Sequence, residues 1–239
     1  MPGEEDEARV EARVEAEATD VDPLREAGPA VLRDELGQQL LERHTLQRVL
    51  RLREGELVTL TNGRGSWREC RWTGSGVELS GEVQISAERS QLEVAVAIPK
   101  GDRLEWMVQK LVEIGVDRIQ LLTTERSVVR WDEQRTRKHL ERLQRVAESA
   151  IEQSRRVWNC EIVGPVQARD FLVKVPIAEP GGRSMCDSDR SIAIGPEGGW
   201  ADDEISIAPE SISLSPQVLR VETAAVVAAT LMAAHRGSS

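Results

Sequence analysis

Residues 92–115 read LEVAVAIPKGDRLEWMVQKLVEIG and contain two hydrophobic patterns, one after the other. The first seven residues alternate with the period of two that a β-strand requires, and this pattern ends at Pro99. Gly115 closes the stretch at the position typical of a helix C-cap. Between them, apolar residues recur at the spacing of one helical face, namely Leu104, Met107, Val108, Leu111 and Val112. The stretch predicts a strand followed by a helix, which is the repeating unit of an α/β fold.

The alternation of strand and helix continues to the end of the chain. A long amphipathic helix is predicted over 132–156. A helix is also predicted over 222–235, and because it is apolar nearly all round we expect it to be buried on most sides. Segment 180–190 is rich in Gly and Asp and is predicted to be a surface loop. This order favours an α/β domain with a largely parallel sheet. Further strand patterns occur at residues 118–122, 161–163, 191–194 and 212–215.

The part of the chain before residue 92 has a different character. Residues 1–26 are acidic and lack an apolar stripe, which predicts a disordered tail. Helical spacing follows over 38–53, and then come short strand patterns separated by Gly-rich turns, which are typical of a small barrel. With the charged stretch 87–91 as a linker, we expect one domain over 27–88 and another over 89–239. The strand patterns lie at residues 56–61, 66–72 and 77–79.

The net charge of −10 is concentrated at the amino end of the chain. Residues 1–26 hold ten acidic residues and three arginines, a net charge of −7 that leaves −3 for the rest. Arginine clusters in that remainder, such as the pair Arg155 and Arg156, are able to neutralise RNA phosphates. Solvated helix faces are the simpler interpretation of each cluster. Composition therefore leaves RNA binding open.

Neither a membrane segment nor a metal site is expected. No stretch is apolar over the length that a membrane helix needs, and the acidic start is unlike an export signal. Cys70, Cys160 and Cys186 have neither metal-ligand spacing nor a disulfide pattern. These features predict a cytoplasmic protein with reduced thiols and no metal.

Three loops follow predicted strands of the second domain. Residues 123–127 follow one strand, the run Gly195-Pro196-Glu197-Gly198-Gly199 follows Ile194, and residues 216–223 follow Ser215. In open α/β sheets, ligands bind beyond the carboxyl ends of the strands. Glycine, which has no Cβ, lets the backbone approach a ligand closely. Taken alone, the glycine run indicates only a tight turn.

Seven segments, in order along the chain, give it a specific likeness. They are 44–52 with Gly55, 62–65, 100–116, 124–127, 147–156, 194–199 and 219–224. By these segments, residues 30–236 resemble the RsmE family of ribosomal RNA methyltransferases. The resemblance implies a PUA-like RNA-binding barrel over 27–88 and a SPOUT α/β domain with a C-terminal trefoil knot over 89–239. It also implies a homodimer that uses S-adenosyl-L-methionine to methylate N3 of a uridine in 16S rRNA of the small ribosomal subunit.

The resemblance also implies roles for single residues. RNA would be bound by Arg48, Arg51 and Arg53 of the barrel and by Arg126 and Arg155 of the second domain. The glycine run and segments 123–126 and 214–219 would form the cofactor pocket. The implied cofactor-binding residues are Thr124, Glu125, Ile194, Gly195, Glu197, Gly198, Gly199, Leu214, Ser215, Val218, Leu219 and Thr223.

The chemistry of the reaction suggests catalytic candidates. Uridine is a poor nucleophile at N3 until its proton leaves. We expect Arg220 or Arg156 to stabilise the negative charge that develops on the uracil oxygens, and Glu197 or Glu222 to accept the proton. For Glu222, interaction with the dipole at the start of the last helix is the favoured interpretation. The methyl group of S-adenosylmethionine is already activated, so no metal is required.

Two features depart from the family pattern. The acidic tail is additional, and residues 30–36 lack the aromatic side chains expected at the start of the barrel. The chain has no tyrosine and one phenylalanine, so base stacking would fall to tryptophan or arginine. The alternatives are a knotted methyltransferase for another RNA target and a non-catalytic RNA-binding ribosome-assembly factor. A Rossmann-type enzyme is disfavoured because no G-x-G-x-x-G follows a first strand.

Overall fold

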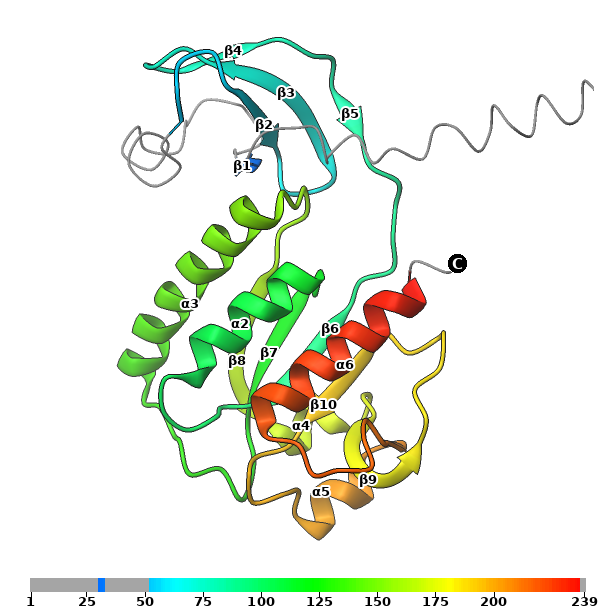
Figure 1. The fold of residues 1–239 in the computed structure, drawn as a ribbon. Coiled ribbons are helices and arrows are strands. Elements are labelled where there is room, and N and C mark those ends of the chain that lie inside the picture. Colours follow the sequence, from blue (N-terminus) through cyan, green and yellow to red (C-terminus); the bar gives the residue numbers. More distant parts are fainter. Residues whose placement is uncertain (1–29, 33–51, 237–239) are drawn as a thin grey trace, which may run out of the picture.

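The computed structural model of the protein describes residues 30–32 and 52–236. They form a small all-β part and a larger α/β part, joined by the extended segment after β5 (Figure 1). The acidic tail, Arg48, Arg51 and nearly all of the helix predicted over 38–53 lie outside the described residues.

The small part is one mainly antiparallel sheet. Strands β2 and β3 form the predicted hairpin, in which Leu57 pairs with Arg71 and Thr61 with Trp67. The order is β1-β2-β3-β4, with β5 also beside β3. Its buried core consists of Val58, Leu60, Cys70 and Trp72. The strands are β1 (Ala30–Leu32), β2 (Leu57–Thr61), β3 (Ser66–Trp72), β4 (Val77–Leu79) and β5 (Gln84–Ile85).

The larger part is built on a six-stranded sheet in the order β11-β9-β10-β6-β7-β8. Every neighbouring pair in it is parallel, as predicted for an α/β domain. This order is compatible with the trefoil knot that the resemblance implies, and the threading itself stays a prediction. The strands are β6 (Glu93–Ala97), β7 (Arg118–Thr123), β8 (Glu161–Gln167), β9 (Ile177–Arg183), β10 (Ser191–Ile194) and β11 (Ser211–Ile212).

Helices cover both faces of this sheet, and on β6 side-chain size separates the two faces. Val94 and Val96 of β6 belong to the large core under α2, α3 and α6, whereas Ala95 between them faces the smaller core around α4 and Trp200. Figure 1 shows α2, α3 and α6 side by side on one face. The three long helices are those predicted, and Gly115 is the C-cap of α2. The helices are α2 (Arg103–Ile114), α3 (Glu133–Ser154), α4 (Ala168–Leu172), α5 (Asp202–Ile207) and α6 (Val221–Arg236). None of these described helices is both long and apolar enough to span a bilayer.

The prediction of a surface loop over 180–190 is wrong at its start. Strand β9 runs through Arg183, between β10 and β11. A Cβ on Gly182 would lie 2.5 Å from the backbone of Ser211, so glycine allows the two strands to approach. The Arg183 guanidinium also contacts Asp189 and Glu210, each at 2.7 Å. Contacts with distant residues therefore form this strand, which its Gly- and Pro-rich sequence conceals.

The small sheet docks on the larger part through the β2–β3 hairpin loop. The backbone N–H of Gly65 donates to Val157 O at 3.0 Å, and that of Asn159 donates to Gly63 O at 2.8 Å. A Cβ on Gly65 would lie 2.3 Å from the Trp158 ring, so the loop approaches that ring as closely as only glycine permits. The small sheet thus docks on the turn between α3 and β8.

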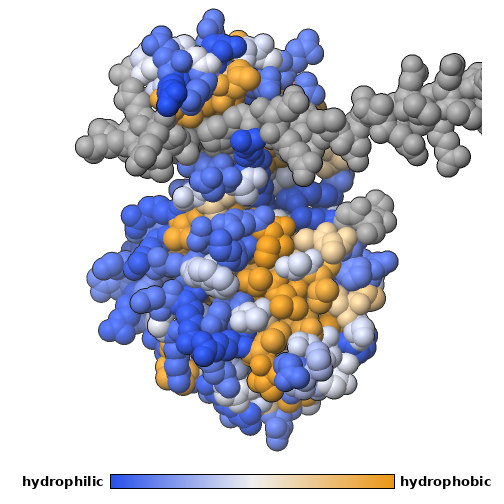
Figure 2. All heavy atoms as spheres, in the orientation of Figure 1, coloured by the Kyte–Doolittle hydropathy of each residue, from blue (hydrophilic) through white to orange (hydrophobic). Residues whose placement is uncertain are grey.

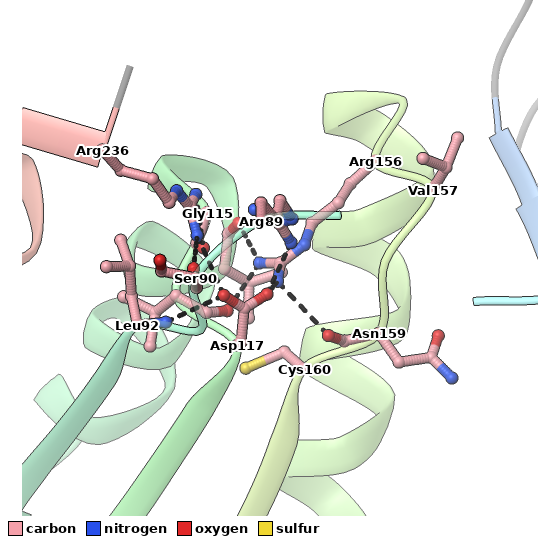
Figure 3. Close-up of polar contacts among 12 residues, drawn as sticks. Arg89, Ser90, Leu92, Gly115, Asp117, Arg156, Val157, Asn159, Cys160 and Arg236 are labelled. Carbon is pink, nitrogen blue, oxygen red and sulfur yellow. Dashed lines mark hydrogen bonds and ion pairs between the residues drawn. The ribbon is translucent and has the colours of Figure 1, made fainter. Parts of the chain in front are cut away.

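An ion-pair cluster centred on Asp117 lies beside this junction, at the amino ends of the strands. Asp117 accepts hydrogen bonds from Arg89 and Arg156 at 2.5 Å and from Arg236 at 2.9 Å (Figure 3). It also accepts one from the backbone N–H of Leu92 at 3.0 Å. These partners come from the linker, from the end of α3, from the end of α6 and from the start of β6. One side chain therefore joins four segments that are far apart in sequence.

The cluster holds three guanidinium groups around a single carboxylate. Burial lowers the pKa of Arg156 and lowers that of Arg89 to about 10, and the nearby charge of Asp117 opposes both shifts. The neighbouring Cys160 thiol is also buried, which raises its pKa to about 12. That thiol is therefore protonated at neutral pH, as expected of an unreactive cysteine.

Removing the Asp117 carboxylate leaves three arginines without their common partner. We expect Asp117→Ala to lower the free energy of unfolding by about 3–5 kcal/mol, the cost of breaking a buried ion pair from one side. Urea denaturation of the full chain measures this loss. Asp117→Asn keeps the shape and one acceptor, so its loss is expected to be smaller. Equal stability of wild type and the alanine variant would contradict a structural role for the cluster.

Candidate ligand pocket at the carboxyl ends of the strands

A pocket opens at the opposite end of the sheet from Asp117, where the chain leaves β10 and β11 and beside the first half of β9. Four segments build its wall: the first half of β9, the glycine run with the following tryptophan, the stretch between β11 and α6, and the first turn of α6. The lining residues are Ala178, Glu179, Pro180, Ile194, Gly195, Pro196, Glu197, Gly199, Trp200, Ser213, Leu214, Ser215, Gln217, Val218, Leu219, Val221 and Ala224.

The glycine run packs against the indole of Trp200. A Cβ on Gly195 would lie 2.9 Å from Trp200 Cε2, which is too close for any other residue without a shift of the wall. The buried indole is fixed in turn, because its Nε1–H donates to Ala178 O at 3.2 Å. The glycine loop, Trp200 and β9 therefore form one continuous wall.

The loop after β7 supports this wall from outside. Arg126 donates from Nη1 to Gly198 O at 3.2 Å and to Trp200 O at 2.8 Å. The buried carboxylate of Glu204 accepts the backbone N–H groups of Glu125 and Ala201, both at 2.9 Å. The two loops are thereby held together without a direct backbone pairing.

The structure brings together most of the residues expected to bind a cofactor. Ile194, Gly195, Glu197, Gly199, Leu214, Ser215, Val218 and Leu219 all line the pocket. The other four of the set do not line it, and their role in cofactor binding stays a prediction.

Each of these four residues lies outside the wall for a local reason. Thr124 is buried with its hydroxyl 2.8 Å from Ser127 Oγ, and the Glu125 carboxylate pairs with Arg169 at 2.7 Å. Gly198 packs against Arg126. Thr223 is exposed, because Val221 and Ala224 occupy the inner side of that helical turn.

The expected catalytic residues lie in different surroundings. Arg220 is exposed between two lining residues, and no described carboxylate pairs with it, so its role toward the substrate stays a prediction. Glu222 is buried at the start of α6 and lies 3.4 Å from Arg103. Glu197 lines the pocket, where its Oε1 accepts the Lys100 N–H at 3.4 Å.

The structure corrects the catalytic role expected of Arg156. Its guanidinium is buried at the amino ends of the strands, away from the pocket. The two terminal nitrogens donate to Val112 O, Val116 O, Asn159 O and Asp117, so none is directed at a ligand. Arg156 is therefore a structural residue of the Asp117 cluster.

The arginines expected to bind RNA do not form one group. Arg53 is exposed just before β2, whereas Arg126 supports the glycine loop. Arg155 ends α3 with a left-handed φ of 56°, next to the turn on which the small sheet docks. The described part of the chain holds no group of three or more side chains suited to a metal.

Three functional features escaped the sequence analysis. Because β9 was missed, Pro180 was assigned to a loop and Glu179 was assigned to no element. Trp200 had a detectable signal, since a large apolar residue directly follows the glycine run. Glu204 follows Ala201 by three residues, the spacing at which a glutamate reaches back to a helix start.

Comparison with known proteins agrees with this architecture. A family model described as an RNA methyltransferase domain matches residues 86–233, and one described as an RNA methyltransferase PUA domain matches residues 46–76. Ribosomal RNA small subunit methyltransferase E from Synechocystis is 31% identical in an alignment that covers 77% of this chain and 68% of the relative. The chain belongs to the RsmE family of RNA methyltransferases.

Other RsmE proteins and solved structures resemble the whole described chain. The Bacillus subtilis protein of the same name is 26% identical, over 78% of this chain and 85% of its own. A Legionella pneumophila methyltransferase in complex with S-adenosylmethionine superposes with a TM-score of 0.72 at 27% identity, over 87% of this chain and 97% of its own. Ribosomal RNA small subunit methyltransferase E from Neisseria gonorrhoeae, bound to S-adenosylmethionine, has a TM-score of 0.70 at 26% identity, over 86% and 96%. The SPOUT α/β class and the PUA-like barrel are thereby confirmed.

The glycine run offers two matched substitutions that test the pocket wall. A Cβ at residue 195 collides with Trp200, whereas one at residue 198 would lie 3.5 Å from Arg126 Cβ, an ordinary contact. We expect Gly195→Ala to lower the free energy of unfolding by about 1–3 kcal/mol, as overpacking does, and Gly198→Ala to change it by less than about 0.5 kcal/mol. Urea denaturation measures both. Similar losses for the two variants would show that the Trp200 contact is not the constraint.

Proposed function

We propose that this RsmE-family chain transfers the methyl group of S-adenosyl-L-methionine to N3 of a uridine in 16S rRNA of the small ribosomal subunit. The observation that carries the proposal is the pocket at the carboxyl ends of β10 and β11, beside the first half of β9. Two solved relatives bind S-adenosylmethionine, and the curated relatives are named for small-subunit rRNA.

The residues of the pocket suit this ligand. Trp200, Leu214 and Leu219 give the lining apolar surface, which suits an adenine ring. Glu179 and Glu197 supply negative charge, and no described lining residue supplies positive charge. The ligand carries a methyl group on a positively charged sulfur, which supplies the activated group for transfer.

The chain's own residues have two tasks in this proposal. The pocket wall aligns the reacting groups, which lowers the entropic part of the barrier. Arg220, exposed at the rim and unpaired among described residues, stabilises negative charge on the uracil oxygens. Glu197 accepts the N3 proton. Glu222 is left out of this chemistry because Arg103 and the α6 terminus account for it.

RNA binding is proposed to begin at the barrel. The family model for residues 46–76 is that of an RNA methyltransferase PUA domain, and exposed Arg53 lies within it. Arg48 and Arg51 belong to the same proposal. A substrate of this kind places the protein in the cytoplasm.

The proposed activity is tested by methyl transfer from labelled S-adenosylmethionine to purified small subunits and to free 16S rRNA. We expect one methyl group per rRNA, mapped by mass spectrometry to N3 of a uridine. Methyl on another RNA or atom would favour a related knotted enzyme. Ligand binding without transfer to any RNA would favour a ribosome-assembly factor.

The same assay tests the role of Arg220. We expect Arg220→Ala to lower kcat about 100-fold, the usual effect of losing one donor to a developing anion. S-adenosylmethionine affinity is expected to stay within about twofold of wild type, because the side chain does not line the pocket. A wild-type kcat in this variant would remove Arg220 from the mechanism.

We also propose that the chain forms a homodimer through α6 and the adjoining part of α2. Helix α6 was expected to be buried on most sides, but Val227 and Leu231 on one of its faces are only half-buried. Trp106 of the neighbouring α2 is 48% exposed. In Figure 2 an apolar patch covers this region of the surface. Contiguous apolar surface of this kind typically marks an interface between proteins.

A charge placed in this patch is expected to separate the protomers. Val227→Glu should convert a dimer into a species of 26.5 kDa, measured by light scattering after gel filtration. Val173→Glu is the matched control, because Val173 is 53% exposed beside α4 on the other face of the sheet. A monomeric wild type, or a dimer in both variants, would contradict the proposed interface.

A further inference from the structure

The pocket has an uneven balance of charge. Its wall carries the carboxylates of Glu179 and Glu197, while its described lining contains no lysine, arginine or histidine. Cationic residues adjoin the pocket without lining it. Arg126 donates from Nη1 to two carbonyls of the glycine loop, Arg220 is exposed between two lining residues, and the Lys100 N–H contacts Glu197. The pocket therefore suits a cation better than an anion.

The two carboxylates differ in how they are satisfied. Glu197 is exposed and accepts a backbone N–H from Lys100. Glu179 is half-buried, and among the described residues it has neither a hydrogen bond nor an ion pair. Burial raises the pKa of Glu179 because its charged form loses hydration. An unpaired carboxylate in such a place is relieved by a ligand that brings positive charge.

The backbone on both sides of Glu179 is fixed. Ala178 O accepts the Trp200 indole N–H at 3.2 Å. Further along β9, Arg183 forms ion pairs with Asp189 and Glu210, both at 2.7 Å. The strand also pairs with β10 and β11. The carboxylate is therefore held at the wall by a rigid strand.

We propose that Glu179 makes the pocket prefer the charged methyl donor over the uncharged product of the reaction. This inference rests on the proposed function. S-adenosylhomocysteine lacks the transferred methyl group, and its sulfur is neutral, but it keeps the adenine, ribose and amino acid groups of the donor. Attraction between Glu179 and the sulfur centre exists only before transfer. Its loss afterwards favours exchange of the product for a new donor molecule.

The test is calorimetric binding of three ligands to the full-length wild-type chain and to Glu179→Gln. S-adenosylmethionine and sinefungin carry a positive charge at the position in question, and S-adenosylhomocysteine does not. We expect the variant to bind both charged ligands about five- to tenfold more weakly, as loss of one partly screened charge pair predicts. Its affinity for S-adenosylhomocysteine should change by less than about twofold.

Two further variants separate charge selection from other effects. Glu141→Gln removes one negative charge from an exposed position on α3, outside the pocket lining. It is expected to leave all three affinities unchanged. Thermal unfolding shows whether each variant is folded. If Glu179→Gln is not folded, Glu179→Asp replaces it, because it keeps the charge on a shorter side chain. We expect Glu179→Asp to retain at least half of the wild-type preference, measured as the ratio of the dissociation constants of S-adenosylhomocysteine and S-adenosylmethionine.

Each other result overturns the inference in a recognisable way. Equal weakening of all three ligands would mean that Glu179 contacts a group they share, such as the ribose hydroxyls or the ammonium. Unchanged affinities would mean that it contacts none of them. If the folded wild type binds none of the three ligands, the proposed function itself fails. If wild type binds but only the charge preference is absent, the proposed function stands and this inference falls.

Discussion

The common direction of the strands in the six-stranded sheet is the constraint on which the rest of the structure depends. Because every neighbouring pair is parallel, all the carboxyl ends lie at one edge and all the amino ends at the other. The glycine run, the stretch after β11 and the loop after β7 therefore meet at one edge. Asp117, the linker and the turn on which the small sheet docks meet at the other edge. A single topological rule thus separates the ligand pocket from the structural junction.

The amino-end junction shows how a protein keeps several charges out of water. One carboxylate serves three arginines and a backbone N–H, and terminal nitrogens of Arg156 and Arg236 also bond to carbonyl groups. The Nε atoms of Arg89 and Arg156 are buried without a hydrogen-bond partner among the described residues. Such a cluster costs desolvation energy, but it fixes one arrangement of linker, α3 and α6. Helix α6 reaches from this junction to the pocket, since Arg236 ends it at Asp117 and Val221 begins it in the pocket wall.

The pocket illustrates a different use of charge. Its lining is largely apolar, and its two carboxylates have no cationic partner within it. A structural ion pair would neutralise such groups, as Asp189 and Arg183 neutralise each other nearby. Unneutralised carboxylates in a lined pocket are instead available to a ligand. This contrast, rather than any single residue type, separates the residues that hold the fold from those that act on a ligand.

The sequence by itself determined the α/β class and the three long helices, because hydrophobic period and turn chemistry act over short distances. The same signals placed segments 194–199 and 214–219 near the ends of predicted strands, but only the resemblance to the RsmE family implied that they form a cofactor pocket. Tertiary structure alone decided that β9 is a strand and that Glu179 lines the pocket, since distant partners such as Ser211 create that strand. It also decided that Arg156 is structural. The sequence does not show whether the partner of an arginine is a substrate or a buried aspartate. Only the fold shows which of the two is within reach.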